Sequence, residues 1–162
     1  MAQRGWDDQS CPPALCWWKR GAAVQGIGRS RGGLSTKVSL IVDALGLPVA
    51  FEITEGQRHD IKSAPALVAK AKPRCLLADK AFDSDAFRAE LQSRGCVAVI
   101  PSNGSRVPKL PYDSDLYKAR SAVECAFNLL KHARRFATRY EKTLRNYAAV
   151  VAIGCALLWL RV

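Results

Sequence analysis

Several residue types that mark familiar protein classes are scarce in this chain. Its six cysteines form no Cys-x-x-Cys pair and it has only two histidines, so the usual spacing of structural zinc ligands is missing. The C-terminal run from Tyr147 to Leu160 carries no charge, but its 14 residues are too few to cross a bilayer, and we expect a buried helix there. The N-terminus has no apolar run of signal-peptide length. We therefore expect a cytoplasmic protein with reduced thiols and no membrane partner.

Acidic residues are also few. Asp and Glu number 14 against 25 Lys and Arg, which gives a net charge of +11 and a pI near 9.7. The 49% hydrophobic content argues against a disordered chain, and 162 residues suffice for one domain with a core. The charge favours a polyanionic partner, of which nucleic acid is the commonest, over a basic surface without a role.

The chain divides into two parts. Residues 1–25 show no sustained period of 2 or 3.6 and contain a Pro-Pro break, so we expect an unmatched N-terminal segment there, either disordered or translated out of frame. The part 26–162 opens with the basic, Gly-rich "GIGRSRGG", and patterned segments follow.

These segments predict an α/β fold with a mixed sheet flanked by helices. "TKVSLIVDALG" and "PVAFEIT" predict a hairpin, with Asp43 at its turn. "RCLLAD" and "CVAVIP" predict buried strands. We expect a helix in "IKSAPALVAKAK" capped by Asp60, a helix in "DSDAFRAELQSRG" capped by Asp83 or Ser84, and helices over 114–139 and 142–160.

One predicted helix carries a narrow polar stripe. Tyr117, Arg120, Glu124 and Lys131 fall within an arc of roughly 60° at 100° per residue, opposite a stripe of small and aliphatic residues. Two interpretations remain open: a solvated face with an Arg120–Glu124 ion pair, or the wall of a site.

A second acidic position ends a strand. Asp79 follows the apolar "RCLLA", and catalytic groups of open α/β sheets collect beyond strand carboxyl ends. Asp79 could bind Mg²⁺, with Glu124 as a second ligand, and metals held in this way promote phosphoryl transfer. The alternative is a turn-forming or ion-paired Asp79.

Taken together, these blocks resemble the DDE transposases of bacterial insertion sequences, in the large group that includes insertion sequence families four and five. "ADKAFDSD" is similar to the block that carries the second acid of the Asp-Asp-Glu triad, and Tyr117, Arg120, Glu124 and Lys131 match the Y-x2-R-x3-E-x6-K spacing of the third. "GRSRGGLSTKVSLIVDALGLPVAF", "EGQRHDI" and "RNYAAVVAIGCALLWLR" also look like family segments, so that the resemblance covers 26–162.

The resemblance implies a ribonuclease H-like catalytic domain that cleaves DNA at element ends and joins them to target DNA with Mg²⁺ or Mn²⁺. It implies that Asp79 and Glu124 are the metal ligands and that the partner is DNA, both terminal repeats and target, in a bacterial, nucleoid-associated setting. It further implies DNA-binding or site-supporting roles for other residues: Tyr117, Arg120, Lys131, His59, Arg29 and Arg31.

The chain departs from the family at its N-terminus. The family's first acid lies on a first, central strand, and no matching block precedes "GRSRGG". Asp7 and Asp8 lie in a stretch that is not strand-like, and Asp43 is better explained as a turn residue. We therefore expect an N-terminally truncated transposase that lacks this strand and has impaired catalysis. Two ways of filling the gap stay open: "ALCWWK" could be recruited as a replacement strand, or the two halves of the sheet could pair directly.

Two further interpretations stay open. The chain could be a non-catalytic basic DNA-binding fragment that interferes with full-length transposase through shared DNA ends or mixed oligomers. It could instead be an RNA- or ribosome-associated protein, which the ordered motif blocks disfavour. Besides DNA, the partners considered are a second copy of the chain and full-length transposase.

Overall fold

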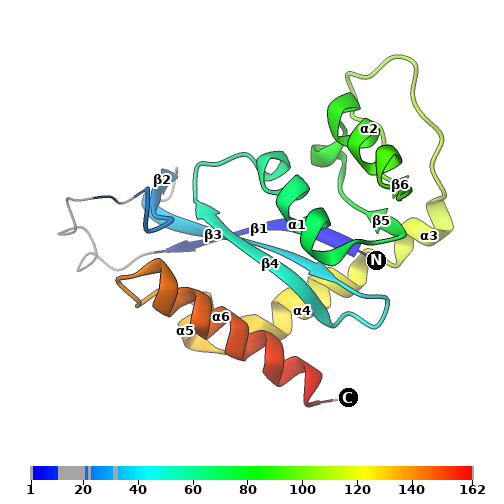
Figure 1. Cartoon of the computed structure of the whole chain (residues 1–162). Coiled ribbons are helices and arrows are strands. Elements are labelled where there is room, and N and C mark those ends of the chain that lie inside the picture. The colour runs from blue at the N-terminus through cyan, green and yellow to red at the C-terminus, as the bar shows by residue number, and fades with distance from the viewer. Residues whose placement is uncertain (1, 11–20, 22, 31–32, 162) are drawn as a thin grey trace.

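A six-stranded mixed sheet lies between two groups of helices (Figure 1). The computed structural model describes residues 2–10, 21, 23–30 and 33–161, and only the backbone of 2–10. The strands are β1 (Ala2–Ser10), β2 (Gly28–Ser30), β3 (Gly33–Val42), β4 (Pro48–Glu55), β5 (Cys75–Leu77) and β6 (Val97–Val99). The helices are η2 (Asp60–Lys62), α1 (Ala64–Ala71), η3 (Lys80–Phe82), α2 (Asp85–Ser93), α3 (Ser114–Lys118), α4 (Ser121–Lys131), α5 (Arg134–Ala137) and α6 (Leu144–Trp159).

The predicted hairpin is confirmed. β3 and β4 pair antiparallel, and β2 pairs with the start of β3. The turn depends on Asp43, whose Oδ1 accepts hydrogen bonds from the backbone N–H groups of Leu45 and Leu47, both at 2.9 Å. Gly46 has φ +82, a conformation that a side chain would disfavour.

The expectation of a missing central strand is wrong. The sheet order is β2-β3-β1-β5-β6, with β4 also on β3, so β1 fills the place between the hairpin and β5. β1 is antiparallel to β3 and parallel to β5, where Ala2 pairs with Leu77. A sheet ladder is made by backbone groups, and without β1 the donors and acceptors on both neighbours would be unpaired at about 1 to 3 kcal/mol each when buried. "ALCWWK", the segment considered as a replacement strand, lies outside the described residues.

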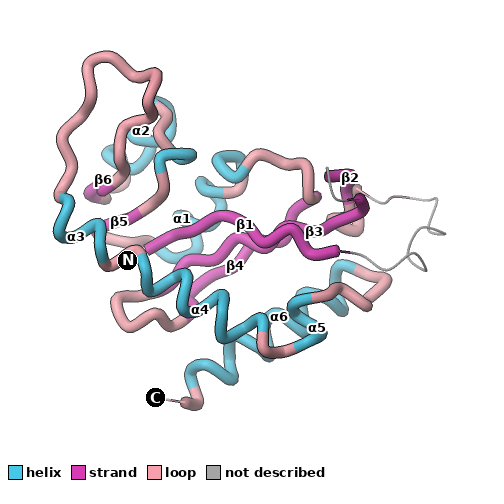
Figure 2. The backbone as a smooth tube through the Cα atoms, turned by 180° about the vertical axis from the view of Figure 1, so that it is seen from behind, coloured by secondary structure: helices cyan, strands magenta, loops and turns pink. Residues whose placement is uncertain are grey.

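Alternate residues of the strands supply two separate cores. Leu40, Val42 and Leu77 pack against α4, α5 and α6 on one face of the sheet. Ile41 and Leu76 pack against α1, η3 and α2 on the other. This alternation is the period of two that strands impose, and it produces three layers. Figure 2 views the molecule from behind and shows α4 running across the near face of the strands, with α1 on the opposite face.

Two of the predicted helical segments begin differently from the expectation. Asp60 does not cap a helix; it lies in η2 and pairs with Lys37 Nζ at 2.8 Å, and α1 begins only at Ala64 because Pro65 suits a first helical turn. Ser84 is the N-cap residue of α2, while Asp83 makes ion pairs instead.

The single helix expected over 114–139 is divided into three. Between α3 and α4 the backbone tightens into i→i+3 hydrogen bonds, from Ala119 N to Leu116 O and from Arg120 N to Tyr117 O. No proline or glycine marks this bend in the sequence, and it changes the direction of the polar stripe between Tyr117 and Glu124.

The helix expected to be buried at the C-terminus is buried on one face only. Tyr147, Val151, Cys155 and Leu158 of α6 pack on the sheet, whereas Ile153 and Leu157 are 61% and 52% exposed. Gly154 allows the close approach of α4, since a Cβ there would lie 3.1 Å from Leu130 Cδ2.

Candidate active site

Asp79 lies just beyond the carboxyl end of β5. Leu77 belongs to the core on the α4 side and Ala78 to the opposite core, and Asp79 continues in an extended conformation with φ −72 and ψ 162. The alternation therefore directs Asp79 to the side of the sheet that α4 covers. Its Oδ1 accepts a hydrogen bond from Lys80 N at 2.6 Å and so begins η3.

The polar stripe reaches this end of β5 through Tyr117. Both views show α3 beside the end of β5 (Figures 1 and 2). Burial raises the pKa of Tyr117, the positive charge of Arg120 opposes that rise, and the negative charge of Asp79 adds to it. The Tyr117 phenol thus lies within electrostatic range of Asp79.

Arg120 connects Tyr117 to Glu124. Its guanidinium carbon lies 5.6 Å from the centre of the Tyr117 ring, a cation–π distance, and its Nη2 donates to Glu124 Oε1 at 2.8 Å. Arg120 Nη1 is buried and has no hydrogen-bond partner. Tyr112 packs edge-on against Tyr117 with ring centres 5.6 Å apart, which fixes the ring from the other side. The Arg120–Glu124 ion pair expected for a solvated face is therefore present, and the same arginine also contacts Tyr117; the wall of a site stays a prediction.

Two carboxylates are a small donor set for a metal. Within the described ranges no group of three or more His, Cys, Asp or Glu side chains could hold an ion. The oxygens of Asp79 and Glu124 nevertheless have the hard character that Mg²⁺ and Mn²⁺ prefer, and Mg²⁺ is commonly held by one or two carboxylates with waters completing its shell. The residues present fit one such ion.

The acids considered as substitutes lie elsewhere. Asp43 is occupied by its turn, as described above. Ala2 is level with Leu77, so the position on β1 level with Asp79 is Arg4, two residues further along each chain. In the backbone register of β1 and β3, Asp8 lies opposite Lys37. It is four residues beyond Arg4, roughly 13 Å along the strand. Asp7 is only one residue nearer.

The other predicted residues are dispersed. Lys131 is exposed at the last turn of α4 and His59 is exposed just before η2, which contacts the η3 segment after Asp79. Arg29 is exposed on β2 and lies opposite Leu34 of β3, whereas Arg4 lies opposite Leu40. These two positions on β3 are six residues apart, so Arg29 lies roughly 20 Å from the level of Asp79. Arg31 lies outside the described residues.

Sequence reasoning missed the role of Asp83. Its fully buried carboxylate accepts from Arg88 Nε and Arg106 Nε, both at 2.8 Å, and from Asn103 N at 2.7 Å. Burial alone would raise the pKa of Asp83, but the hydrogen bonds from Asn103, Arg88 and Arg106 outweigh it and lower the pKa. These bonds fix the loop between β6 and α3 and thereby the approach of α3 to Asp79. In the sequence, the arginines at positions 88 and 106 were the only sign of this role of Asp83.

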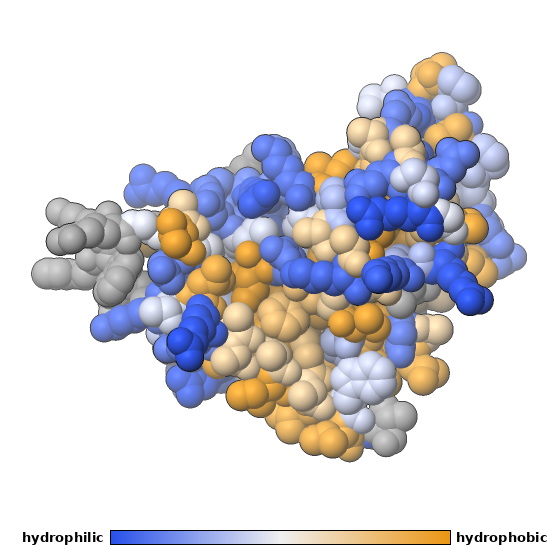
Figure 3. All heavy atoms as spheres, viewed as in Figure 1, coloured by the Kyte–Doolittle hydropathy of each residue, from blue (hydrophilic) through white to orange (hydrophobic). Residues whose placement is uncertain are grey.

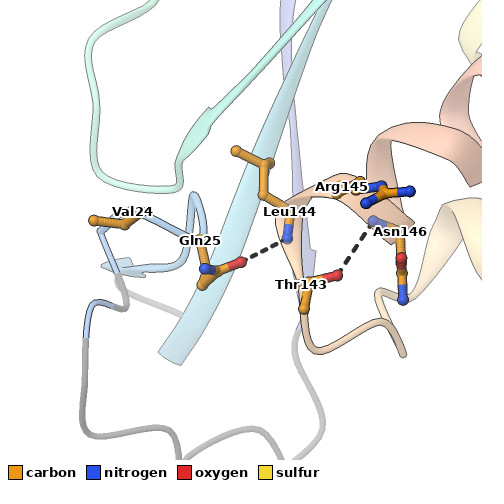
Figure 4. A pocket seen from close by; sticks show the side chains of 6 residues that line it. All are labelled: Val24, Gln25, Thr143, Leu144, Arg145 and Asn146. Atoms are coloured by element: carbon orange, nitrogen blue, oxygen red, sulfur yellow. Dashed lines mark hydrogen bonds between the residues drawn. The ribbon is translucent and has the colours of Figure 1, made fainter.

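A large pocket lies away from these carboxylates. It has a volume of about 570 Å³ between Gln25 and the start of α6, lined in part by Arg145 (Figure 4). The backbone donors there are already used: Leu144 N donates to Gln25 Oε1 at 2.8 Å and Asn146 N to Thr143 Oγ1 at 3.3 Å. We assign no ligand to it.

Comparisons with known proteins give concordant results. The family model described as "Transposase DDE domain" matches residues 18–159. A protein from Brucella ovis, named as a transposase for insertion sequence element IS6501, is 39% identical over 130 residues, 79% of this chain and 100% of that protein. One from Burkholderia cepacia, named as a transposase for insertion sequence element IS402, is 28% identical over 142 residues, and the match spans 80% of this chain and 64% of that relative. Among the residues described, no helix is long and apolar enough to pass through a membrane.

Proposed function

Because the chain belongs to the DDE transposase family of bacterial insertion sequences, we propose that it acts on DNA in transposition through Asp79 and Glu124, and that its own strand cleavage is impaired. The observation that carries this proposal is the pair of contacts by which Arg120 joins Tyr117 to Glu124, while α3 lies beside the end of β5 that leads to Asp79. Two separate sequence blocks contribute: the strand-end position of Asp79 comes from one, and the spacing of the polar stripe from Tyr117 to Lys131 comes from the other.

The ribonuclease H-like fold belongs to the same proposal. In that fold the first strand is central, between the hairpin and the strand that leads to the second acid. The place of β1 between β3 and β5 supports it.

A divalent ion would be held by Asp79 and Glu124. When bound, Mg²⁺ or Mn²⁺ activates water and stabilises the leaving oxygen in phosphoryl transfer. Arg120 orients Glu124 through its hydrogen bond, and its positive charge beside Glu124 would attract a DNA phosphate. Tyr117 supports Arg120 by its ring face.

Impaired cleavage follows from the residue at the level of Asp79. The family places its first acid on the central strand, and here that level of β1 holds Arg4. Positioning and electrostatics supply nearly all the catalysis in phosphoryl transfer, so a lost ligand should reduce the rate by several orders of magnitude. The same feature favours the second candidate function, a non-catalytic DNA-binding chain that competes with, or joins, full-length transposase.

Metal binding tests the site directly. We expect Mn²⁺, followed by titration calorimetry or electron paramagnetic resonance, to bind weakly to the wild type and at least tenfold more weakly to Asp79→Asn and to Glu124→Gln. Glu90→Gln is the matched control, because Glu90 also pairs with an arginine four residues away, Arg94, at 2.8 Å. Equal Mn²⁺ affinity in all four proteins would refute the assignment of Asp79 and Glu124.

Cleavage separates the two functions. With Mg²⁺ or Mn²⁺ and a duplex carrying the terminal repeats, we expect binding without nicking by the wild type and metal-dependent nicking by Arg4→Asp, which places an acid level with Asp79. Wild-type nicking that disappears in Asp79→Ala and in Asp8→Ala or Asp43→Ala would reveal a substitute ligand and contradict impairment. Wild-type nicking that is indifferent to Asp79→Ala would indicate a contaminating nuclease.

A further inference from the structure

The segment that follows α4 carries cations without acids. Between Glu124 and Glu141 the sequence has no Asp or Glu, and its Lys and Arg residues are Lys131, Arg134, Arg135 and Arg139. Arg134 and Arg135 belong to the short helix α5, and both are exposed. Figure 3 shows hydrophilic residues gathered at the end of the molecule where α5 and the start of α6 lie, beside the apolar surface of the rest of α6. A basic surface therefore follows directly on the helix that carries Glu124.

A buried arginine anchors this segment. Arg139 has no exposed surface; its Nη1 donates to Thr36 Oγ1 at 2.6 Å, and its Nε donates to the carbonyl oxygen of Glu141 at 3.1 Å. The guanidinium carbon of Arg139 lies 5.1 Å from the centre of the Tyr147 ring. Burying a cation is costly without such partners. The contacts of Arg139 therefore fix the backbone between α5 and α6 against β3.

The two exposed arginines are themselves held in place. Arg134 Nε donates to the Tyr140 hydroxyl at 3.1 Å, and its guanidinium carbon lies 6.0 Å from the centre of that ring. Arg135 Nη2 pairs at 2.9 Å with Glu141 Oε1; the Arg135 side chain is 71% exposed, whereas that of Glu141 is only 5% exposed. Each guanidinium therefore has a fixed partner and also a surface open to solvent. An arginine held in this way binds a phosphate at a lower cost in side-chain entropy than a mobile one.

The two arginines continue the direction of the polar stripe on α4. Glu124 and Lys131 are seven residues apart, which places them within about 20° of each other around the helix and roughly 10 Å apart along it. α5 begins at Arg134, three residues past Lys131, and contacts α4. Figure 2 shows α3, α4 and α5 following one another across the molecule. Arg134 and Arg135 therefore lie roughly 10 to 20 Å from Glu124, the length of about three to six base pairs at 3.4 Å each.

We propose that Arg134 and Arg135 bind the phosphate backbone of the same DNA duplex that the candidate active site receives, about three to six base pairs from Asp79 and Glu124. This inference rests on the proposed function, since it takes that site as the position of the DNA end. Phosphate contacts carry no base information. The two arginines therefore fix the register of the duplex on the protein and not its sequence.

Duplexes with a single uncharged methylphosphonate test the proposal. The modification is placed in turn at each phosphate within about twelve base pairs of the end of the terminal repeat, and affinity is measured by fluorescence anisotropy at about 50 mM salt without added metal. We expect one or two phosphates, about three to six base pairs from that end, at which the modification weakens wild-type binding about threefold or more. In the double variant Arg134→Gln/Arg135→Gln the same modifications should have no effect, because the side chains that contact those phosphates are already gone.

The double variant Lys72→Gln/Arg94→Gln is the matched control. It removes two positive charges as well, from the exposed C-cap residues of α1 and α2, and Arg94 also pairs with a glutamate, Glu90, at 2.8 Å. We expect this control to keep the wild-type pattern of sensitive phosphates. The Arg134/Arg135 variant should also lower the slope of log affinity against log salt concentration by the amount expected for about two phosphate contacts, whereas the control should leave the slope unchanged.

Arg134→Gln alone leaves the ion pair of Arg135 with Glu141 intact, and it repeats the test if circular dichroism shows the double variant to be poorly folded. It should abolish the sensitivity of one of the phosphates. Three results would each overturn the proposal and leave DNA binding intact: sensitivity spread evenly over all phosphates, equal losses in the arginine variant and the control, or an arginine variant that keeps the sensitive phosphates. A wild type that binds none of the duplexes would overturn the proposed function together with this inference.

Discussion

The carboxylate of Asp83 has no exposed surface, yet it accepts bonds from three donors on two segments: Arg88 of α2, and Arg106 and Asn103 N of the β6–α3 loop. Removing one member of a buried ion pair leaves the others without compensation. Asp83 therefore acts on the candidate active site at a distance, by holding the loop that leads to α3.

At the residue scale we predict that Asp83→Asn lowers the free energy of unfolding by about 3 to 5 kcal/mol at pH 7. Urea unfolding followed by circular dichroism measures this. Asp85→Asn is the matched control: Asp85 pairs with the same Arg106 but is 85% exposed, and its substitution should cost no more than about 1 kcal/mol. Equal effects of the two substitutions would contradict the role of burial.

The pH dependence has a definite sign. The folded state lowers the pKa of Asp83 from its ordinary value of 3.8, so its stabilisation is fully present above that value and is lost as pH falls through the lower, folded value. We predict that, as pH falls below about 4, the wild type loses stability more steeply than Asp83→Asn does. Parallel stability curves for the two proteins across that range would exclude Asp83 as the cause.

At the element scale, α4 and α6 approach each other closely at Gly154. Gly154 on α6 faces Leu130 on α4, and a Cβ would lie 3.1 Å from Leu130 Cδ2. We predict that Gly154→Val lowers the free energy of unfolding by about 1 to 3 kcal/mol through overpacking. In Gly154→Ala the gain of about 1 kcal/mol in helix propensity offsets a smaller clash. Thermal unfolding of both variants, with Leu130→Ala added to Gly154→Val as a rescue, provides the measurement; failure of the rescue would place the strain elsewhere.

How much of the architecture the sequence predicts depends on where each element draws its stability. The β3–β4 hairpin and α6 have their own periodicity, and Asp43 has a turn chemistry, so all three were predictable. β1 has no such pattern. It is held by backbone hydrogen bonds to β3 and β5, whose donors and acceptors would otherwise be unpaired, and so its own residues give little sign of a strand. The bend at Ala119–Arg120 arises from packing, without a breaker residue, and was therefore not predictable from local sequence. The spacing of Arg120 and Glu124 did predict their contact, since both lie within one helical turn of each other.

At the scale of the whole molecule the net charge of +11 dominates its encounter with DNA. We predict that affinity for duplex DNA falls about 10²-fold or more between 50 and 200 mM salt, because phosphate contacts release counterions. Fluorescence anisotropy with terminal-repeat and unrelated duplexes measures both the slope and the modest sequence preference that we expect. Lys131→Ala should reduce the slope of log affinity against log salt concentration by about the amount expected for one lost phosphate contact. An affinity that is flat across this salt range would count against a nucleic-acid partner.

The position of β1 also has a consequence for how the domain is made. β1 comes first in the chain, but its partner in β5 is Leu77, 75 residues after Ala2. A ribosome adding about 5–20 residues per second needs several seconds to supply that partner, and long-range pairing of this kind is slow to nucleate. During synthesis β1 can pair with the β3–β4 hairpin as soon as that hairpin has emerged, whereas the other edge of β1 stays open until β5 is made. The arrival of β5 therefore completes the sheet, and nascent chains are most exposed to aggregation before it is in place.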